Sequence, residues 1–197
     1  MTKMKIILAS SSPARKMLME TLHIPFTCSH PDVDETQKEN ESAAQLVERL
    51  ARAKAEKIAQ SKKHSLIIGC DQVAAYQGII YGKPLTHERA IEMLNIFSGN
   101  EITFLTGMCV INSDTQEAQY IVEPYYVKFK KLSEEDIENY LQKDKPYRCA
   151  ASIKVESLGI ALIEKMRGDD PNAIIGLPLM QLIRMLNNEG VNVLENH

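Results

Sequence analysis

The stretch IILASSSPARKMLMETL, residues 6–22, joins an apolar run to a helical pattern through three serines and a proline. The apolar run predicts a buried strand, with Ser12 as the N-cap of the following helix and Pro13 at its first position. The first backbone N–H groups of a helix have no partner within it, and the helix dipole places partial positive charge there. Arg15 adds a full positive charge in the first helical turn. This junction therefore predicts an anion-binding site where the strand ends.

Outward from this junction, helical and strand patterns mix along the whole chain, and neither a repeat nor a long linker interrupts them. Strands are expected at residues 65–76, 101–111, 117–132 and 159–166, and helices at 42–61, 86–97, 133–141 and 178–187. Such mixing favours an α/β fold with a mixed sheet over a strictly alternating βαβ arrangement. At 197 residues the chain is long enough for a sizeable core, and we expect a single domain spanning 1–197.

Composition and charge argue against several classes of protein. A formal net charge of −3 and a pI near 6.0 give no overall field to attract nucleic acid or an acidic membrane, and neither is expected as a partner. No run approaches the roughly 18 apolar residues that span a bilayer, and the first residues lack a signal peptide's apolar core. A cytoplasmic location is therefore expected. The four cysteines include no C-x-x-C pair and are expected to be reduced core thiols.

Two charged residues fall where apolar ones belong. Lys54 lies on the apolar stripe of the helix expected at 42–61. Its stem could pack while its ammonium reaches solvent, or its charge could point into a cleft. Asp71 interrupts the apolar strand at 65–76, and a buried carboxylate requires a cation, a metal ion or hydrogen-bond donors beside it. A turn could satisfy it structurally; otherwise Asp71 is the best general-base candidate in the chain.

Two weaker signals add a carboxylate and a second lysine. Glu35 lies in the acidic segment PDVDET, residues 31–36, which suits a magnesium ion that keeps several waters, although acidic loops are usually just hydrated. Lys83 follows a turn beyond Asp71 that could return it to the same place, although it could also be a hydrated turn lysine. The glycines of this turn are too closely spaced for a Walker A loop. Together, the carboxylates, lysines, arginine and serines suit metal-assisted attack of water on a phosphate chain.

Taken in order, these residues resemble the Maf family of nucleotide pyrophosphatases, historically called septum-formation inhibitors. The resemblance covers nearly the whole chain and rests above all on LASSSPARKML (8–18), RLARAKAEKIA (49–59), IIGCDQV (67–73) and GKPLT (82–86). It implies the Maf/ITPase-like fold, an elongated mixed sheet flanked by helices in two lobes with a central cleft, and a homodimer. It also implies hydrolysis of a nucleoside triphosphate between the α and β phosphates, with Mg²⁺ or Mn²⁺ as the cofactor.

The resemblance assigns roles to individual positions. Those that match the family's triphosphate and metal site are Ser10, Arg15, Glu35, Lys54, Asp71 and Lys83. The arginine and the two lysines would neutralise phosphate oxygens during catalysis. Asp71 would be the proton acceptor and, together with Glu35, a ligand of the divalent metal.

Within the family, the chain is similar to the subgroup that acts on 7-methyl-GTP, notably in CAASIKVESLGIALIE (149–164) and in DQV (71–73). The pyrimidine subgroup usually has glutamine where this chain has Glu156. A carboxylate accepts from both N–H donors of a guanine edge and attracts the methylated, cationic base. Gln72 is expected to share this selectivity. Where the family often has a bulky residue this chain has Ala14, so an aromatic platform for the base must come from Tyr or Phe elsewhere or be absent.

Two alternatives stay open at this point. The chain could instead hydrolyse dTTP, UTP or modified pyrimidine nucleotides. It could also bind nucleotides without turnover, as a regulator of septum formation. Steady-state rates on 7-methyl-GTP, GTP, UTP and dTTP separate these possibilities.

Overall fold

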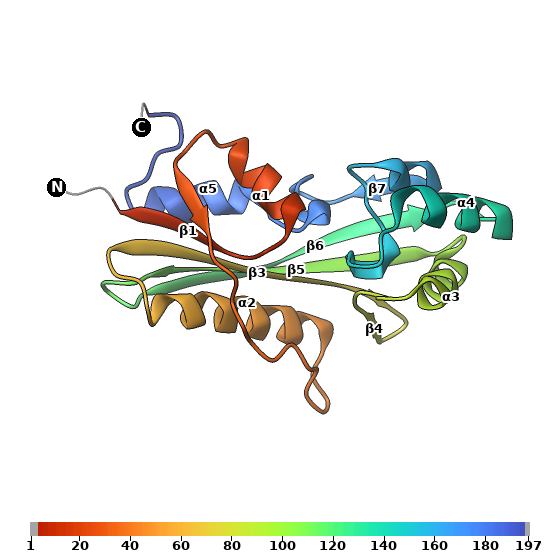
Figure 1. The fold of residues 1–197 in the computed structure, drawn as a ribbon, viewed down its shortest axis with the longest axis horizontal. Helices are drawn as coiled ribbons and strands as arrows, with labels where there is room; N and C mark the ends of the chain where they lie inside the picture. The colour runs from red at the N-terminus through yellow and green to blue at the C-terminus, as the bar shows by residue number, and fades with distance from the viewer. Residues whose placement is uncertain (1–3, 196–197) are drawn as a thin grey trace.

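The computed structural model describes residues 4–195 and contains one seven-stranded mixed sheet (Figure 1). Its strands are β1 (Lys5–Ala9), β2 (Phe26–Cys28), β3 (Ser65–Tyr76), β4 (Ile79–Tyr81), β5 (Glu101–Asn112), β6 (Ala118–Phe129) and β7 (Ile163–Arg167). They follow the order β2-β1-β3-β5-β6-β7, and β4 pairs with β3 beside that path. β1 is parallel to β2 and β3, whereas the other pairs are antiparallel. The predicted mixed sheet is confirmed.

The helices flank this sheet on both sides. They are α1 (Pro13–Glu20), α2 (Ala43–Ala59), α3 (His87–Phe97), α4 (Glu134–Asp144) and α5 (Leu179–Asn188). Short 3-10 turns add η1 (Ala150–Ser152), η2 (Leu158–Leu162) and η3 (Ala173–Ile175). Figure 1 shows α2 below the sheet, α1 and α5 above it near the chain ends, and α3 and α4 at the opposite end. The α/β class is therefore confirmed, with helices on both faces of an elongated sheet.

Alternate residues of β1 enter two different cores. Ile6 and Leu8 join the core shared with α1 and α5, whereas Ile7 and Ala9 join the core shared with α2. Successive side chains of a strand point to opposite faces, so an uninterrupted apolar run indicates a strand that is covered on both faces. The strand predicted before the serines is thus confirmed, and Ser12 caps the following helix as predicted.

The backbone of α2 meets the sheet at two glycines. A Cβ atom on Gly69 of β3 would lie 2.2 Å from the carbonyl oxygen of Ala51, and one on Gly107 of β5 would lie 2.2 Å from that of Val47. No side chain could occupy either space, so helix and sheet approach each other more closely than packed side chains allow. This approach brings the middle of α2 directly over the middle of β3.

A further core fills the opposite end of the sheet. It combines side chains of α3 and α4 with those of β5 and β6. Cys70 of β3 belongs to the core beneath α1 and α5, whereas Ala74 of the same strand belongs to this further core. The cores at the two ends of the sheet correspond to the two expected lobes. Asp71 and Gln72 lie in β3 at the border between them.

Two sequence-based expectations are wrong. The strand predicted at 159–166 begins only at Ile163, because η2 occupies the preceding residues. A Cβ atom on Gly159 would lie 2.4 Å from the carbonyl oxygen of Lys154, so the chain folds tightly back on itself there instead of extending. The cysteines are free, but Cys28 is exposed and Cys149 is only partly buried, so only Cys70 and Cys109 are core thiols.

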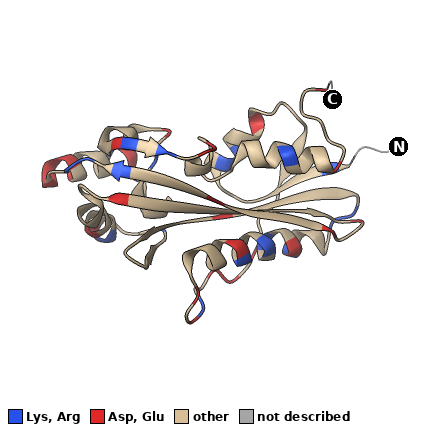
Figure 2. Ribbon diagram, turned by 180° about the vertical axis from the view of Figure 1, so that it is seen from behind, with Lys and Arg blue, Asp and Glu red and all other residues tan. Residues whose placement is uncertain are grey.

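Charged residues of both signs are mixed along the helices, as Figure 2 shows for α2. Some form ion pairs one helical turn apart, such as Arg52 with Glu48 and Lys16 with Glu20. Such exposed pairs contribute little to stability. In the described part of the chain, no helix combines the length and the apolar character needed to cross a membrane.

Candidate functional site

A buried lysine joins two carboxylates near the middle of the sheet. The Nζ atom of Lys54 lies 2.6 Å from Oδ1 of Asp71 and 2.5 Å from Oε1 of Glu35. Lys54 is 5% exposed and Asp71 7% exposed, whereas the side chain of Glu35 is 48% exposed. The ammonium of Lys54 therefore does not reach solvent along the surface, and its charge, carried by α2, compensates the buried aspartate.

The loop that carries Glu35 is anchored to α2. Arg49 donates to the carbonyl oxygen of Thr36 at 3.0 Å and to both carboxylate oxygens of Glu41 at 2.5 and 2.9 Å. These charge-assisted bonds hold the loop against the helix that supplies the buried lysine. Lys83, which follows β4, places its Nζ atom 3.7 Å from Oε2 of Glu35. The turn after β3 thus returns Lys83 to the same cluster.

The charge of Glu35 is stabilised by its surroundings. Burial raises the pKa of Glu35, but the hydrogen bond and charge of Lys54, with the charges of Lys83 and Arg15, hold it below its ordinary value. Glu35 is therefore ionised at neutral pH. Three cations from three segments lie close enough to act on one carboxylate, and phosphate oxygens in the same place would feel the same charges.

Arg15 is held by main-chain carbonyls rather than by a carboxylate. Its Nε donates to the carbonyl oxygen of Gly176 and its Nη1 to that of Cys70, each at 2.8 Å. Among the described residues, its Nη2 has no hydrogen-bond partner and can donate to an anion. At the start of α1, Oγ of Ser10 accepts from the N–H of Ser12 at 3.1 Å. The predicted anion-binding junction therefore keeps an unused guanidinium donor, and its role stays a prediction.

Gln72 is fixed by partners that the sequence analysis missed. Its Nε2 donates to Oγ1 of Thr106 at 2.9 Å and to the carbonyl oxygens of Ala173 and Ile174 at 2.8 and 3.1 Å. Thr106 lies opposite Gln72 in the register of β3 with β5 and is 1% exposed. The signal that could have found Thr106 is a polar residue within an apolar strand. The sequence of neither strand alone predicts the register that pairs Thr106 with Gln72.

Two predicted specificity residues lie apart from the lysine cluster. Glu156 is exposed in the segment between η1 and η2, and Ala14 is half-buried in α1. Among residues 4–195, neither forms a hydrogen bond or an ion pair with the buried lysine or its carboxylates. Burial raises the pKa of the Cys149 thiol, which the charge of Lys154 opposes and the charge of Glu156 reinforces.

The two carboxylates can hold a metal ion only in part. Lys54 contacts one oxygen of Asp71 and one of Glu35, and Oε2 of Glu35 lies 3.7 Å from Nζ of Lys83. Within the described range, no group of three or more His, Cys, Asp or Glu side chains is placed to hold a metal. Magnesium is often bound by one or two carboxylates, several waters and substrate phosphates. The chemistry of Glu35 and Asp71 suits that mode of binding.

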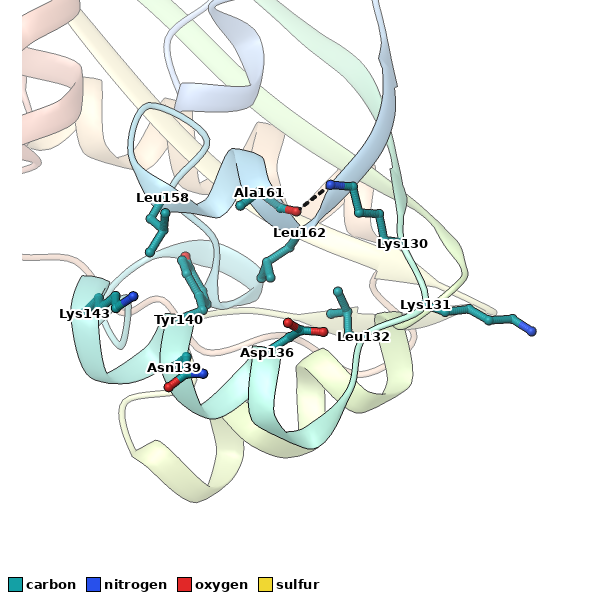
Figure 3. A pocket seen from close by; sticks show the side chains of 10 residues that line it. All are labelled: Lys130, Lys131, Leu132, Asp136, Asn139, Tyr140, Lys143, Leu158, Ala161 and Leu162. Atoms are coloured by element: carbon teal, nitrogen blue, oxygen red, sulfur yellow. Dashed lines mark hydrogen bonds between the residues drawn. The ribbon is translucent and has the colours of Figure 1, made fainter.

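A surface hollow of about 370 Å³ lies elsewhere, beside α4 and η2. Figure 3 shows Lys130 beside it, donating to the carbonyl oxygen of Ala161, and Lys131 extending away from it. None of the predicted site residues lines this hollow. The contacts around the buried lysine, rather than this hollow, therefore define the candidate site.

Solved structures agree with this fold. The Ham1 protein of Staphylococcus aureus superposes with a TM-score of 0.52 at 16% identity, covering 94% of this chain and 99% of that one. A Ham1 protein from Coxiella burnetii gives the same TM-score at 17% identity. At such identities the likeness concerns the fold alone, and it bears out the expected elongated sheet.

Sequence comparison is more specific. A relative from Methylobacillus flagellatus named 7-methyl-GTP pyrophosphatase is 51% identical over 189 residues, which cover 96% of this chain and 98% of the relative. A relative of the same name from Colwellia psychrerythraea is 49% identical, with 96% and 94% covered. The family model described as Maf-like protein matches residues 5–189. By the extent of that match and the closeness of these relatives, the chain belongs to the Maf-like protein family.

Proposed function

We propose that this protein is a nucleoside triphosphate pyrophosphatase that hydrolyses 7-methyl-GTP to 7-methyl-GMP and diphosphate, removing a modified nucleotide. Relatives that are 49% and 51% identical over nearly their full length carry the name of that activity. The observation that carries the proposal is the buried contact of Lys54 with Asp71 and Glu35. It places two carboxylates from different segments within hydrogen-bond distance of the same ammonium.

The residues of the site divide the reaction between them. Lys54, Lys83 and the free Nη2 of Arg15 would bind the triphosphate and offset the charge that develops on its oxygens. Asp71 would orient the attacking water and accept its proton while the bond between the α phosphate and the diphosphate breaks. A bound Mg²⁺ or Mn²⁺, held by Glu35 and Asp71, would supply Lewis-acid polarisation of the phosphate chain. Ser10, at the strand end, would add a polar contact to the phosphates.

Selectivity for the methylated guanine is assigned to residues around the cluster. Glu156 would accept hydrogen bonds from the two N–H donors of the base, and its charge would attract the methylated ring. Gln72 would contribute its Oε1 atom, because its Nε2 is already committed to three acceptors. Ala14 would leave this part of α1 without the bulky side chain that the family often has there.

The test is a substrate panel under matched metal conditions. Diphosphate release is measured from 7-methyl-GTP, GTP, UTP and dTTP with Mg²⁺, with Mn²⁺ and with a chelator, and Asp71→Asn serves as the inactive control. The proposal predicts the highest kcat/KM for 7-methyl-GTP and a loss of turnover without metal. Preference for UTP or dTTP would assign the protein to pyrimidine nucleotides instead. Tight nucleotide binding with no diphosphate release would identify a non-hydrolytic regulator.

Two further properties are part of the proposal. We infer a homodimer from the resemblance to the family, and light scattering coupled to gel filtration checks it. We infer a cytoplasmic location, which the absence of disulfides among the four cysteines supports, because thiols persist in a reducing compartment. Cell fractionation with an antibody to the chain tests that location.

A further inference from the structure

The segment after β7 supplies main-chain carbonyls that hold two predicted site residues. The carbonyl oxygen of Gly176 accepts from Nε of Arg15 at 2.8 Å. The carbonyl oxygens of Ala173 and Ile174 accept from Nε2 of Gln72 at 2.8 and 3.1 Å. One short loop therefore fixes an arginine that comes from α1 and an amide that comes from β3.

The conformation of this loop, residues 172–176, depends on a buried side chain. Asp170 is 1% exposed, and its Oδ1 accepts from the N–H and Nδ2 of Asn172 at 2.9 and 3.2 Å. Its Oδ2 accepts from the N–H of Met180, in the first turn of α5, at 2.7 Å. A carboxylate with several N–H donors forms strong, directional bonds. Asp170 therefore ties the start of the 172–176 loop to the helix that follows it.

The loop has little freedom to hold its two partners in another way. Gly176 has a φ of +111°, a conformation that glycine adopts without strain, and a Cβ atom there would lie 3.3 Å from Nε of Arg15. The carbonyl oxygen of Ala173 also accepts from Oγ1 of Thr106 at 3.0 Å. A shift of the loop would therefore move the arginine and the amide together.

We propose that Asp170 is a positioning residue for the nucleotide site. By restraining the 172–176 loop, it keeps Arg15 and Gln72 in the places from which they meet the substrate. Asp170 does not itself touch the nucleotide and acts through the carbonyls of the loop. The inference rests on the proposed function, because that function places a phosphate at Arg15.

The experiment compares two neighbouring aspartates. Asp170→Asn keeps the shape of the side chain but turns one acceptor into a donor that faces an N–H group. Asp169→Asn is the matched control, because Asp169 is exposed. Each change is made in the wild type and in Arg15→Lys, whose ammonium keeps the charge but cannot bridge two carbonyls as a guanidinium does. The readouts are the Kd for a GTP analogue with a methylene bridge between its α and β phosphates, and kcat/KM for the nucleotide that the wild type hydrolyses best.

Coupling between the two positions is the decisive result. In the wild type we expect Asp170→Asn to raise the Kd and to lower kcat/KM, each by about tenfold or more. In Arg15→Lys each change should be less than about threefold, because Asp170 acts through the arginine. The Asp169→Asn control should match its parent. An equal loss in both backgrounds, or a lower thermal midpoint with unchanged constants, would show that Asp170 only caps α5 and would overturn the inference.

The outcomes separate this inference from the proposed function. Coupling in Kd without turnover of any nucleotide would leave the positioning role standing and remove the pyrophosphatase. Turnover without coupling would leave the pyrophosphatase standing and remove the positioning role. No nucleotide binding at all would overturn both. If Asp170→Asn does not fold, Thr106→Val removes a donor to the Ala173 carbonyl and also an acceptor of Nε2 of Gln72, and a valine suits a strand. Its effects must then be smaller in Arg15→Lys than in the wild type, and additive effects would contradict the inference.

Discussion

Replacing Lys54 by methionine isolates the charge at the centre of the site. Lys54→Met keeps an unbranched side chain of similar length on α2 and removes only the ammonium. Its two partners respond differently, because Glu35 is half exposed and can be hydrated, whereas Asp71 is 7% exposed and cannot. Removing one partner of a buried ion pair costs about 3 to 5 kcal/mol, since the other charge stays buried and uncompensated.

That cost sets the expected shift in thermal stability. One kcal/mol corresponds to about 2 to 4 °C in a protein of this size, so the melting midpoint of Lys54→Met should fall by about 6 to 20 °C. The control is Lys57→Met, three residues along the same helix and exposed, which should melt with the wild type. The measurement is calorimetric or circular-dichroism melting at neutral pH without nucleotide.

Activity and stability should separate when the buried charge is also removed. In the double variant Lys54→Met with Asp71→Asn no buried carboxylate is left uncompensated, so the midpoint should recover most of the loss. Hydrolysis should stay absent, because both groups that act on the phosphates and the water are gone. A Lys54→Met protein that melts within a degree or two of the wild type would refute the argument, and so would a double variant that melts no higher than the single one.

Three further changes test other parts of the site. Asp71→Asn should reduce kcat for 7-methyl-GTP by more than about tenfold while nucleotide binding by calorimetry is largely kept, and a milder loss would remove Asp71 from the role of base. Glu156→Gln should lower kcat/KM for 7-methyl-GTP relative to UTP by roughly 2 to 4 kcal/mol of discrimination, and an unchanged ratio would place base selectivity elsewhere. Glu123→Gln tests a buried carboxyl on β6, whose pKa burial raises, with the charges of Asp170 and Asp169 adding to the rise. Because the folded state binds this proton more tightly than the unfolded chain, the wild type loses stability as pH rises through the raised pKa. The variant should therefore melt higher than the wild type at pH 7.5, and the difference should shrink near pH 4; the same difference at both values would contradict the assignment.

Local patterns were enough to predict the elements that carry the cluster. The serine cap and proline of α1 follow from rules that span a few residues, and the structure confirms them. The capping box of Ser42 with Gln45 at the start of α2 is equally local. The positions of Lys54 and Asp71 were conspicuous because each breaks the hydrophobic period of its own segment. The structure explains both charged residues together, because the charge of Lys54 compensates that of Asp71.

The supports of Arg15 and Gln72 could not be predicted in this way. Their partners are main-chain carbonyls of Gly176 and Ala173, and every residue has a carbonyl, so no side chain in the sequence marks these acceptors. Asp170, which restrains those carbonyls, reads in the sequence as one of two adjacent acids before a proline. Only the path of the chain in space shows that one of the two is buried and the other exposed.

The close contact of α2 with the sheet means that the spacing of the site is set by residues without side chains. One added methyl group at Gly69 or Gly107 would meet a helix carbonyl at 2.2 Å, and α2 would have to lift away. The ammonium of Lys54 would lift with it, away from a carboxylate that it now meets at 2.6 Å. A random screen for inactive variants should therefore recover alanine at these two glycines as often as changes of the charged residues. A laboratory that transplants the charged residues to another α/β scaffold must copy these two empty positions as well.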